Sequence, residues 1–477
     1  MNLYPRIAYL ARYQPSKIAI ETPQQRLTYL ELDVWARRIA GLLRACGVKN
    51  GDLVGLRLRD TPLHIAAFFA VMRVGGVILP LDWRGARREF DRVVGQFRPR
   101  IILSDDNPLL DWSPEIVDLS RSSEFDPDDE PLGEAPDGAM ALTMTSGTTG
   151  EPKAMVVTHD QTYARLVTRA LEGLFTANDF YLTTLPLAYL AGREHALNPL
   201  ILGATLMMFP TLFAPQELVD TVNARNITAF NMSPNMSRAL LGLKVPEGQL
   251  LMPNVRTMIS TTGKLDQFER SELRRRVVPR LIDYYGSSGT GPVAVNSKEG
   301  DDPESTAVGH IAIGVEVEIV DNADANLGVE TVGRIRIRGP SITTKMMGVG
   351  ENEEGYRDGW YYPGDLGRID GSGILHLHGR SADLIKRGGL MVHAQEVEGV
   401  LRKHPAVVDV AIVGVPSDTL GQEVVAFLQV RSVVDLKEIT RFCRNELAPY
   451  KIPSRIEILE ALPRNSSGKV VKSALLS

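Results

Sequence analysis

The 477-residue chain has little of what marks several protein classes. It contains two cysteines, Cys46 and Cys443, which lie far apart and lack neighbouring metal ligands. This argues against a disulfide framework or a zinc site and favours packing thiols in a reducing compartment. No window is apolar and uncharged for long enough to span a bilayer, and the first residues contain no uninterrupted apolar run. We therefore expect neither a membrane span nor a signal peptide.

Charge of one sign is also scarce. The formal net charge of −5 gives no electropositive footprint for nucleic acid. What the chain does have is ordinary globular composition, with 44% hydrophobic and 23% charged residues, over a length that suggests more than one domain. The sequence therefore predicts a soluble cytoplasmic protein with an ample core.

Strand and helix patterns alternate along the first part of the chain. Thr28 and Glu31 form a capping-box pattern that opens a helix ending near Gly47. Residues 62–74 read as a buried helix between two short buried strands. This alternation predicts an α/β fold with a mostly parallel sheet. The strand candidates are 53–58, 77–81, 180–185, 205–209, 227–231, 257–260 and 280–285.

Two further stretches shape the predicted domain organisation. Residues 113–139 are rich in Ser, Pro, Asp, Glu and Gly, which predicts a solvated loop whose acidity needs no partner. From residue 382 a compact α/β unit follows, with predicted helices at 396–403 and 436–447 and strands at 407–415 and 424–430. We place the boundary near Gly379 and Arg380, which gives an N-terminal domain at 1–378 and a C-terminal domain at 379–477.

Hydroxyls, glycines and a lysine are concentrated between residues 143 and 154. Glycines let backbone N–H groups turn toward an anion, hydroxyls donate hydrogen bonds, and lysine adds a mobile charge. The pattern predicts a polyphosphate loop, although its spacing differs from the common P-loop and a plain surface loop has similar composition. Its residues are Thr145, Ser146, Gly147, Thr148, Thr149, Gly150 and Lys153.

Five stretches in one order resemble the adenylate-forming superfamily of acyl-CoA synthetases, peptide-synthetase adenylation domains and luciferases. They are residues 145–153, 283–289, 359–365, 379–398 and 463–469. The resemblance runs from about residue 27 to the end of the chain. It implies a large N-terminal domain of stacked, mostly parallel sheets with flanking helices. A small C-terminal α+β domain, joined by a hinge, would follow.

The resemblance also implies a nucleotide site. The loop at 145–153 would grip the β- and γ-phosphates of ATP, Tyr285 would lie on the adenine, and Asp365 would accept both ribose hydroxyls. An ordinary strand-end tyrosine and a turn-capping aspartate are the alternatives for these two residues. The other residues that the resemblance assigns to ATP or AMP are Gly263, Asp283, Gly286, Ser288 and Arg380.

The activity that the resemblance implies has two steps. A carboxylate attacks the α-phosphate of Mg²⁺-bound ATP and releases pyrophosphate, and the thiol of CoA then attacks the acyl-adenylate and releases AMP. Lys469 would bridge the carboxylate and the α-phosphate, because a cation between two like charges lowers the barrier. The small domain would rotate between the steps, and Gly388 and Gly389 would border the pantetheine tunnel.

Three positions depart from the family pattern. Gly289 stands where the family has a glutamate that helps to hold Mg²⁺, and Ala382 stands at the hinge where Asp or Lys is usual. Tyr189 stands where CoA ligases often carry a histidine. The polar residues after it, Arg193, Glu194 and His195, are read as a polar helix start rather than as catalytic groups. The acid-pocket candidates are Tyr189, Asn231, Met232 and Gly289.

These features favour a free-standing ligase that couples a fatty or aromatic acid to CoA. The sequence lacks the aspartate-bearing stretch of amino-acid-activating members near residues 186–195. We also expect no carrier domain after residue 477. Transfer to the phosphopantetheine of a separate carrier protein is a second hypothesis, and homodimer formation is left open. A third hypothesis, motivated by Gly289 and Ala382, is a degenerate member that binds nucleotide or acyl group with little turnover.

Overall fold

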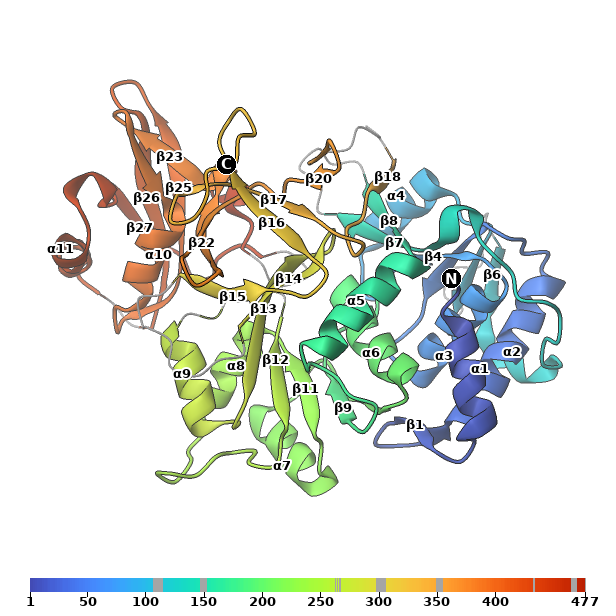
Figure 1. Ribbon diagram of the computed structural model, residues 1–477. Helices are drawn as coiled ribbons and strands as arrows, with labels where there is room; N and C mark the ends of the chain where they lie inside the picture. Colours follow the sequence, from blue (N-terminus) through green and yellow to red (C-terminus); the bar gives the residue numbers. More distant parts are fainter. Residues whose placement is uncertain are drawn as a thin grey trace. The chain divides into compact units, whose positions relative to one another are not determined.

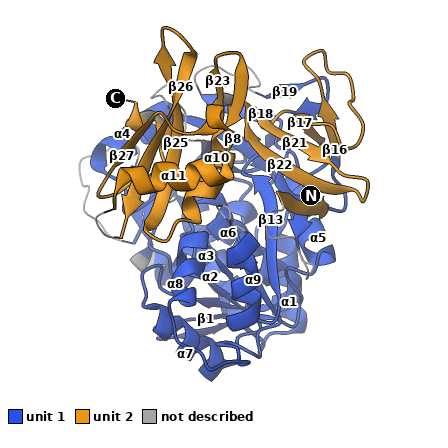
Figure 2. Ribbon diagram, turned by 90° about the vertical axis from the view of Figure 1, so that its left-hand side faces the viewer, with its two compact units in different colours: residues 1–301, 311–316, 338–361 blue, residues 302–310, 317–337, 362–477 orange. Residues whose placement is uncertain are grey.

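The computed structural model describes residues 1–105, 115–145, 152–261, 263, 265, 267–296, 306–348, 355–431, 434–464 and 470–476 (Figure 1). The chain divides into two compact units (Figure 2). Unit 1 contains Met1–Asp301, Ile311–Glu316 and Arg338–Tyr361, and unit 2 contains Asp302–His310, Val317–Ile337 and Tyr362–Ser477. The domain boundary near residue 379 stays a prediction.

The first sheet of unit 1 has the strand order β18-β8-β7-β4-β3-β5-β6. The pairs β4–β7, β3–β4, β3–β5 and β5–β6 are parallel, and β7–β8 and β8–β18 are antiparallel. The strands are β3 (Leu53–Arg57), β4 (Val77–Pro80), β5 (Ile101–Ser104), β6 (Glu115–Asp118), β7 (Ala139–Thr145), β8 (Lys153–Thr158) and β18 (Lys345–Gly348).

The second sheet of unit 1 has the order β14-β13-β12-β11-β9-β10-β1-β2. Its neighbours are parallel from β13 to β1, with an antiparallel strand at each end. The strands are β1 (Ile18–Glu21), β2 (Arg26–Thr28), β9 (Phe180–Thr183), β10 (Thr205–Met208), β11 (Ala229–Met232), β12 (Thr257–Ser260), β13 (Leu281–Ser287) and β14 (Gly291–Asn296). A short hairpin, β19 (Tyr356–Arg357) and β20 (Trp360–Tyr361), also belongs to unit 1.

Helices cover the second sheet on both faces. On one face Val219, Leu240 and Leu273 from three helices pack against buried strand residues such as Phe230 and Met258. On the other face α5 and α6 contact the strands. The helices of unit 1 are α1 (Tyr4–Tyr13), α2 (Tyr29–Ala45), α3 (Pro62–Arg73), α4 (Arg87–Phe97), α5 (His159–Leu171), α6 (Leu190–Leu202), α7 (Pro215–Arg225), α8 (Pro234–Leu241) and α9 (Gln267–Arg276).

Several local predictions for unit 1 agree with the structure. The Thr28 side chain accepts a hydrogen bond from the Glu31 N–H, and the Glu31 side chain accepts one from the Thr28 N–H, which completes the capping box of α2. Helix α3 is buried along most of its length, as its uniformly apolar sequence predicts. No helix in the described ranges combines the length and apolar character that a membrane span needs.

The prediction of a solvated acidic loop at 113–139 is wrong in part. Residues 115–118 form β6, which pairs with β5. Asp128 is buried, and its carboxylate lies 2.8 Å from Nε of Arg73 and 3.0 Å from Nε of Arg44. One arginine from each of two helices therefore compensates its charge. A buried carboxylate without a cation would be unfavourable.

Unit 2 contains two smaller sheets. The first has the order β17-β21-β22-β15 with β16 on β17, and the second has the order β24-β23-β26-β25 with β27 on β26. Apolar residues of the second sheet, α10 (Ala394–Arg402) and α11 (Leu436–Glu446) form one core that includes the thiol of Cys443. The strands are β15 (Ala307–Ile311), β16 (Glu316–Val320), β17 (Gly333–Arg338), β21 (Asp365–Ile369), β22 (Ile374–Arg380), β23 (Leu384–Arg387), β24 (Leu390–His393), β25 (Val407–Ser417), β26 (Gly421–Val430) and β27 (Arg455–Ile458).

The fold class predicted from the sequence is confirmed. Unit 1 combines mostly parallel sheets with flanking helices, and unit 2 contains the smaller α+β arrangement. In parallel α/β sheets ligands bind beyond the carboxyl ends of the strands, so these ends of β9, β11, β12 and β13 are the place to look for a site.

Candidate active site

The predicted phosphate loop connects two paired strands. Thr145 is the last residue of β7 and Lys153 the first of β8, and the two are Cα partners across the antiparallel pair. Lys153 also pairs with Gly348 of β18. The structure thus places both ends of the predicted loop side by side. The loop residues Ser146, Gly147, Thr148, Thr149 and Gly150 lie outside the described residues.

Strand β13 carries the predicted adenine site. Asp283 is buried, and its carboxylate lies 3.2 Å from Nη1 of Arg270. Tyr285 is half-buried, and the register of the β13–β14 pair shifts between it and Gly286. A side chain at Gly286 would collide with the Gly291 carbonyl group, so glycine is required there. Gly263, beyond the end of β12, is exposed.

A tight turn follows β13. The Ser287 N–H donates to the Thr290 hydroxyl at 2.9 Å, and the Gly289 N–H donates to the Ser287 hydroxyl at 3.2 Å. A Cβ atom at Gly289 would lie 3.3 Å from Sδ of Met155 and 3.4 Å from the hydroxyl of Tyr361. The turn is therefore packed against β8 and the β19–β20 hairpin at the position where the family has its glutamate.

Two acid-pocket candidates, Asn231 and Met232, lie on opposite faces of the second sheet of unit 1. Asn231 is fully buried, and its side-chain amide has no hydrogen-bond partner among the described residues. Met232 points to the opposite face and packs in the core with Leu240, because successive strand residues alternate. Met232 is therefore not a pocket residue on the Asn231 side, and its assignment is corrected. Tyr189 occupies the N-cap position of α6, and its hydroxyl donates to the Asp82 carboxylate at 2.9 Å.

The predicted ribose, hinge and tunnel residues belong to unit 2. Asp365 and Arg380 are Cα partners across β21 and β22, with Nε and Oδ1 3.5 Å apart. Ala382 lies in the short turn Ser381–Asp383. Gly388 and Gly389, between β23 and β24, both have positive φ, at 58° and 82°, a conformation that glycine adopts without strain. Lys469 lies outside the described residues.

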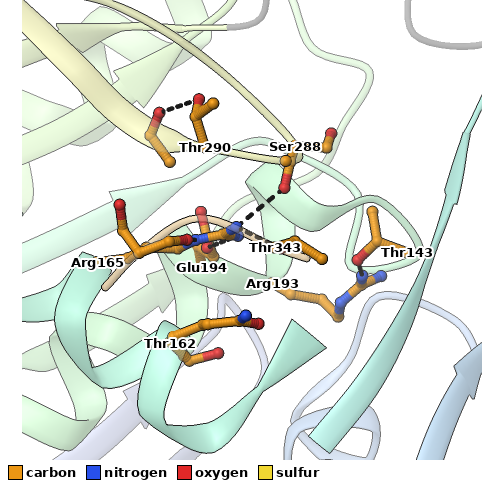
Figure 3. A network of polar contacts seen from close by, with 12 residues as sticks. Thr143, Thr162, Arg165, Arg193, Glu194, Ser288, Thr290 and Thr343 are labelled. Carbon is orange, nitrogen blue, oxygen red and sulfur yellow. Dashed lines mark hydrogen bonds and ion pairs between the residues drawn. The ribbon is translucent and has the colours of Figure 1, made fainter. Parts of the chain in front are cut away.

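The structure reveals a cluster that the sequence interpretation missed. Arg193, Glu194 and His195 do lie near the start of α6, but they are buried rather than solvated. Arg193 donates to the carbonyl of Ala188 at 2.7 Å. It also donates to the hydroxyl of Thr143 at 3.0 Å (Figure 3). It therefore joins the predicted acid-pocket segment to β7, the strand that precedes the predicted phosphate loop.

Glu194 holds two arginines of α5. Its carboxylate lies 3.1 Å from Nη1 of Arg165 and 2.5 Å from Nη2 of Arg169. Burial alone would raise the pKa of Glu194, but the two guanidinium groups outweigh it and lower that pKa below its usual value. Burial lowers the pKa of Arg193 to about 10, which leaves it charged at neutral pH. The cluster thus holds three cations and one anion away from water.

His195 extends the polar layer to the second sheet. One ring nitrogen lies 2.5 Å from the hydroxyl of Tyr181 and the other 3.4 Å from the hydroxyl of Tyr284. Tyr284 in turn bonds to the hydroxyl of Thr261 at 2.8 Å. Burial lowers the pKa of His195 to about 3, so the ring is neutral at physiological pH. A signal for this layer was present in the sequence, because three ionisable residues interrupt an otherwise apolar helix.

Two family models match the chain. The AMP-binding enzyme model matches residues 8–346, and the AMP-binding enzyme C-terminal domain model matches residues 396–469. The chain therefore belongs to the AMP-binding enzyme family, which confirms the resemblance found in the sequence. The motifs that carry this resemblance lie within or between these two matched regions.

Similar proteins extend along the full length. Indoleacetate–CoA ligase of Aromatoleum aromaticum is 29% identical over 99% of this chain and 97% of its own. The fatty acid–[acyl-carrier-protein] ligase ScoC of Streptomyces coeruleorubidus is 27% identical over 99% of this chain and 96% of its own. O-succinylbenzoate coenzyme A synthetase of Bacillus subtilis, solved with ATP and magnesium ion, has a TM-score of 0.88 at 25% identity and 98% coverage of both chains. The names of these similar proteins are consistent with the ligase activity that the sequence predicts.

Proposed function

We propose that the chain is an AMP-forming acid–thiol ligase that activates a fatty or aromatic acid with ATP and transfers the acyl group to CoA. The observation that carries this proposal is the match of residues 8–346 and 396–469 to the AMP-binding enzyme models, together with the retained residues of each predicted nucleotide segment. Thr145 and Lys153 flank the predicted phosphate loop as paired strand residues. Asp365 and Arg380 are neighbours that could meet the ribose hydroxyls together.

In the first step a carboxylate oxygen of the acid attacks the α-phosphorus of ATP, and the bond to the pyrophosphate oxygen breaks. The chain contributes cations and donors: Lys153 beside the β- and γ-phosphates, and Lys469 between the acid and the α-phosphate. Each reduces the repulsion between a carboxylate and a phosphate that must approach one another. Tyr285 and Asp283 hold the adenine, which orients the α-phosphorus.

In the second step the sulfur of CoA attacks the acyl carbon, a thioester forms, and AMP leaves with the bonding electrons. The Gly388 and Gly389 turn lines the path of the pantetheine arm, since glycines allow close approach. A carrier-protein phosphopantetheine presents the same thiol on the same arm. The fatty acid–[acyl-carrier-protein] ligase among the similar proteins favours keeping this second acceptor in the test.

Magnesium reaches this site as a complex with ATP. The described residues include no group of three or more His, Cys, Asp or Glu side chains that could hold a metal ion. Mg²⁺ commonly keeps several waters and takes phosphate oxygens with few protein ligands, so such a site is compatible with Gly289. When bound, the ion neutralises phosphate charge; the residues described above provide the binding and orientation.

A panel of acids tests the proposal. Pyrophosphate release is measured with Mg²⁺–ATP and benzoate, indoleacetate, 2-succinylbenzoate, malonate and fatty acids of several lengths, with and without CoA, and products are identified by mass. A CoA thioester is the expected product, at about 1 per second or faster with a good acid. Adenylate without thioester redirects the proposal to a carrier protein. ATP binding without pyrophosphate release across the panel favours the degenerate binder and contradicts the proposal.

Lys469→Ala separates chemistry from binding. We expect this variant to lose pyrophosphate release while it keeps most of its affinity for ATP, because the lysine acts on the reacting groups and the nucleotide has many other contacts. Calorimetry measures the affinity for ATP, and pyrophosphate release measures the rate of adenylation. Lys437→Ala is the control, because Lys437 is an exposed residue of α11 in the same unit. Full adenylation by Lys469→Ala would contradict the assigned role.

A cytoplasmic location and a homodimer remain predictions from the sequence. The first rests on the scarcity of cysteine, and size-exclusion chromatography with light scattering tests the second.

A further inference from the structure

The Arg165 guanidinium is the most fully bonded group of the buried cluster. Its Nη1 donates to Glu194 at 3.1 Å and its Nε to the Ser341 carbonyl at 3.0 Å. Its Nη2 donates to the Ser288 carbonyl at 3.1 Å and to the Thr343 hydroxyl at 2.9 Å. One side chain of α5 thus reaches α6, the turn after β13 and the segment before β18. Figure 3 shows Arg165 directed at Ser288 and Thr343.

The bonds from Arg165 and Thr343 hold two successive peptide groups of the turn. The Ser288 carbonyl accepts from Arg165, and the Gly289 carbonyl accepts from the Thr343 N–H at 2.7 Å. Arg165 also orients Thr343 through its hydroxyl. Because a peptide group is planar, holding its carbonyl oxygen also sets the direction of its N–H. The shape of the Ser287–Thr290 turn is therefore determined from the protein interior.

Burial of such a cluster needs a reason other than stability. A buried ion pair is often no more stabilising than apolar side chains of the same volume, because both charges lose their water. Its distinctive property is that its partners have one geometry, since the planar guanidinium presents its donors in a rigid fork. Here that geometry is transmitted to the turn that contains Ser288, which the resemblance to adenylate-forming enzymes assigns to the nucleotide.

We propose that Arg165 is a positioning residue for adenylation: through Glu194 and the carbonyl groups of Ser288 and Ser341, it holds the Ser287–Thr290 turn in the shape that receives ATP. This inference rests on the proposed function and deepens it. It assigns to Arg165 no contact with substrate; its action passes through the backbone of the turn.

Lysine is the informative replacement. Arg165→Lys keeps the positive charge beside Glu194 but replaces the rigid fork with one flexible ammonium group. That group can satisfy Glu194 and lose the carbonyl groups, so the electrostatics of the cluster change little while the turn is released. The variant thus separates positioning from charge.

Arg256 provides a matched control. Its side chain bonds to one carboxylate, Asp179, and donates to two carbonyl groups, those of Gly173 at 2.8 Å and Leu174 at 3.1 Å. It makes the same kinds of contact as Arg165, but Asp179 and Arg256 come directly before β9 and β12, at the amino ends of these strands. Arg256→Lys therefore tests the same substitution away from the predicted ATP contacts.

The experiment compares wild type, Arg165→Lys and Arg256→Lys at a temperature where thermal melts show all three folded. Calorimetry gives the affinity for Mg²⁺–ATP. Pyrophosphate release gives kcat and KM with the best acid of the panel, and chemically prepared acyl-adenylate plus CoA isolates the second step. For Arg165→Lys we expect ATP affinity or kcat for pyrophosphate release to fall about 10-fold to 100-fold, as a displacement near 1 Å can cause. The second step should change less than threefold, and Arg256→Lys should match wild type in every rate.

Three outcomes would overturn the inference: Arg165→Lys indistinguishable from Arg256→Lys in ATP affinity and rate, equal losses in both half-reactions, or a loss in proportion to the unfolded fraction. If wild type releases no pyrophosphate with any acid, the proposed function fails, and the ATP affinities of the two variants still decide the role of Arg165.

Discussion

Two arginine–carboxylate clusters stand at opposite ends of the second sheet of unit 1. Arg165 with Glu194 reaches the turn beyond the carboxyl end of β13, and Arg256 with Asp179 joins the amino ends of β9 and β12. Both hold backbone carbonyl groups with an arginine that a carboxylate orients. The difference lies in what the carbonyl groups belong to, a predicted ATP-binding turn in one case and a plain helix–strand connection in the other.

Burial also separates the two clusters. The Arg165 side chain is 0% exposed, whereas that of Arg256 is 31% exposed. Water can therefore replace a lost partner at the second cluster more readily than at the first. The two clusters share one chemistry, but only the buried one contacts a predicted ATP-binding turn. We therefore expect the loss of its carboxylate to have the larger effect.

Removal of each carboxylate charge should make that contrast largest. Glu194→Gln leaves Arg165 and Arg169 buried without an anion, and we expect a loss of about 3–5 kcal/mol in the free energy of unfolding. Asp179→Asn leaves a partly hydrated guanidinium, and we expect about 1–3 kcal/mol. Urea denaturation at pH 7 measures both changes. Equal losses would show that the two clusters are energetically alike and would remove the contrast.

A fall in pH from 8 to 5 should produce a smaller difference between the two clusters in the free energy of unfolding. Between pH 8 and pH 5 both carboxylates stay ionised, because the pKa of Glu194 and that of Asp179 lie below their usual values. Burial lowers the pKa of His195, beside Glu194, to about 3, so the unfolded chain takes up a proton first as the pH falls below 6.5. The free energy of unfolding is therefore unaffected by ionisation of His195 above about pH 6.5. It falls progressively from there toward pH 3, by about 2 kcal/mol at pH 5.

His195→Gln isolates that contribution. The amide keeps a donor and an acceptor for Tyr181 and Tyr284 but does not titrate in this range. We expect the variant to lose about 2 kcal/mol less than wild type in the free energy of unfolding between pH 8 and pH 5. Buried His64, whose pKa is also lowered to about 3, is present in both proteins and cancels. Parallel pH profiles would mean that His195 is accessible to protons in the folded protein.

The sequence predicted most of the fold because the signals for it are local. Helix α2 shows its capping box, α3 is uniformly apolar, and β12 coincides with the predicted strand at 257–260. Element ends were less accurate. Strand β13 continues to Ser287 rather than ending at 285, because its antiparallel partner β14 extends the pairing across a register shift.

The predicted site residues all come from sequence motifs. The buried charge cluster was missed, because its contacts join residues that are distant in the sequence. Glu194 looks like a surface residue in the sequence, because its partners are 25 and 29 residues earlier on another helix. The acidity of Asp128 was assigned to solvent for the same reason, since Arg73 pairs with it from 55 residues away. Burial of charge is a tertiary property, so the interruption of an apolar helix by Arg193, Glu194 and His195 marks these residues but does not identify their partners.

Gly289 offers the smallest and most specific test of the rigid turn. Gly289→Glu restores the family's carboxylate, but its Cβ would meet Met155 at 3.3 Å and Tyr361 at 3.4 Å. Because both contacts are side-chain ends that can yield slightly, we expect a loss of about 1 kcal/mol in the free energy of unfolding. Gly95→Glu, at an exposed position of α4 with nothing within 4 Å of its added Cβ, is the matched control and should be neutral or slightly stabilising.

Activity decides what the Gly289 result means. If Arg165 and Thr343 hold the turn in place, the new carboxylate cannot settle into a metal-binding position, and pyrophosphate release should not exceed that of wild type. A higher rate in Gly289→Glu would show that the turn adjusts to admit the side chain and that a metal ligand had been missing. Combining Gly289→Glu with Arg165→Lys then separates the two explanations. A released turn accepts the glutamate with a smaller stability loss than the sum of the single variants, whereas an independent turn gives additive losses.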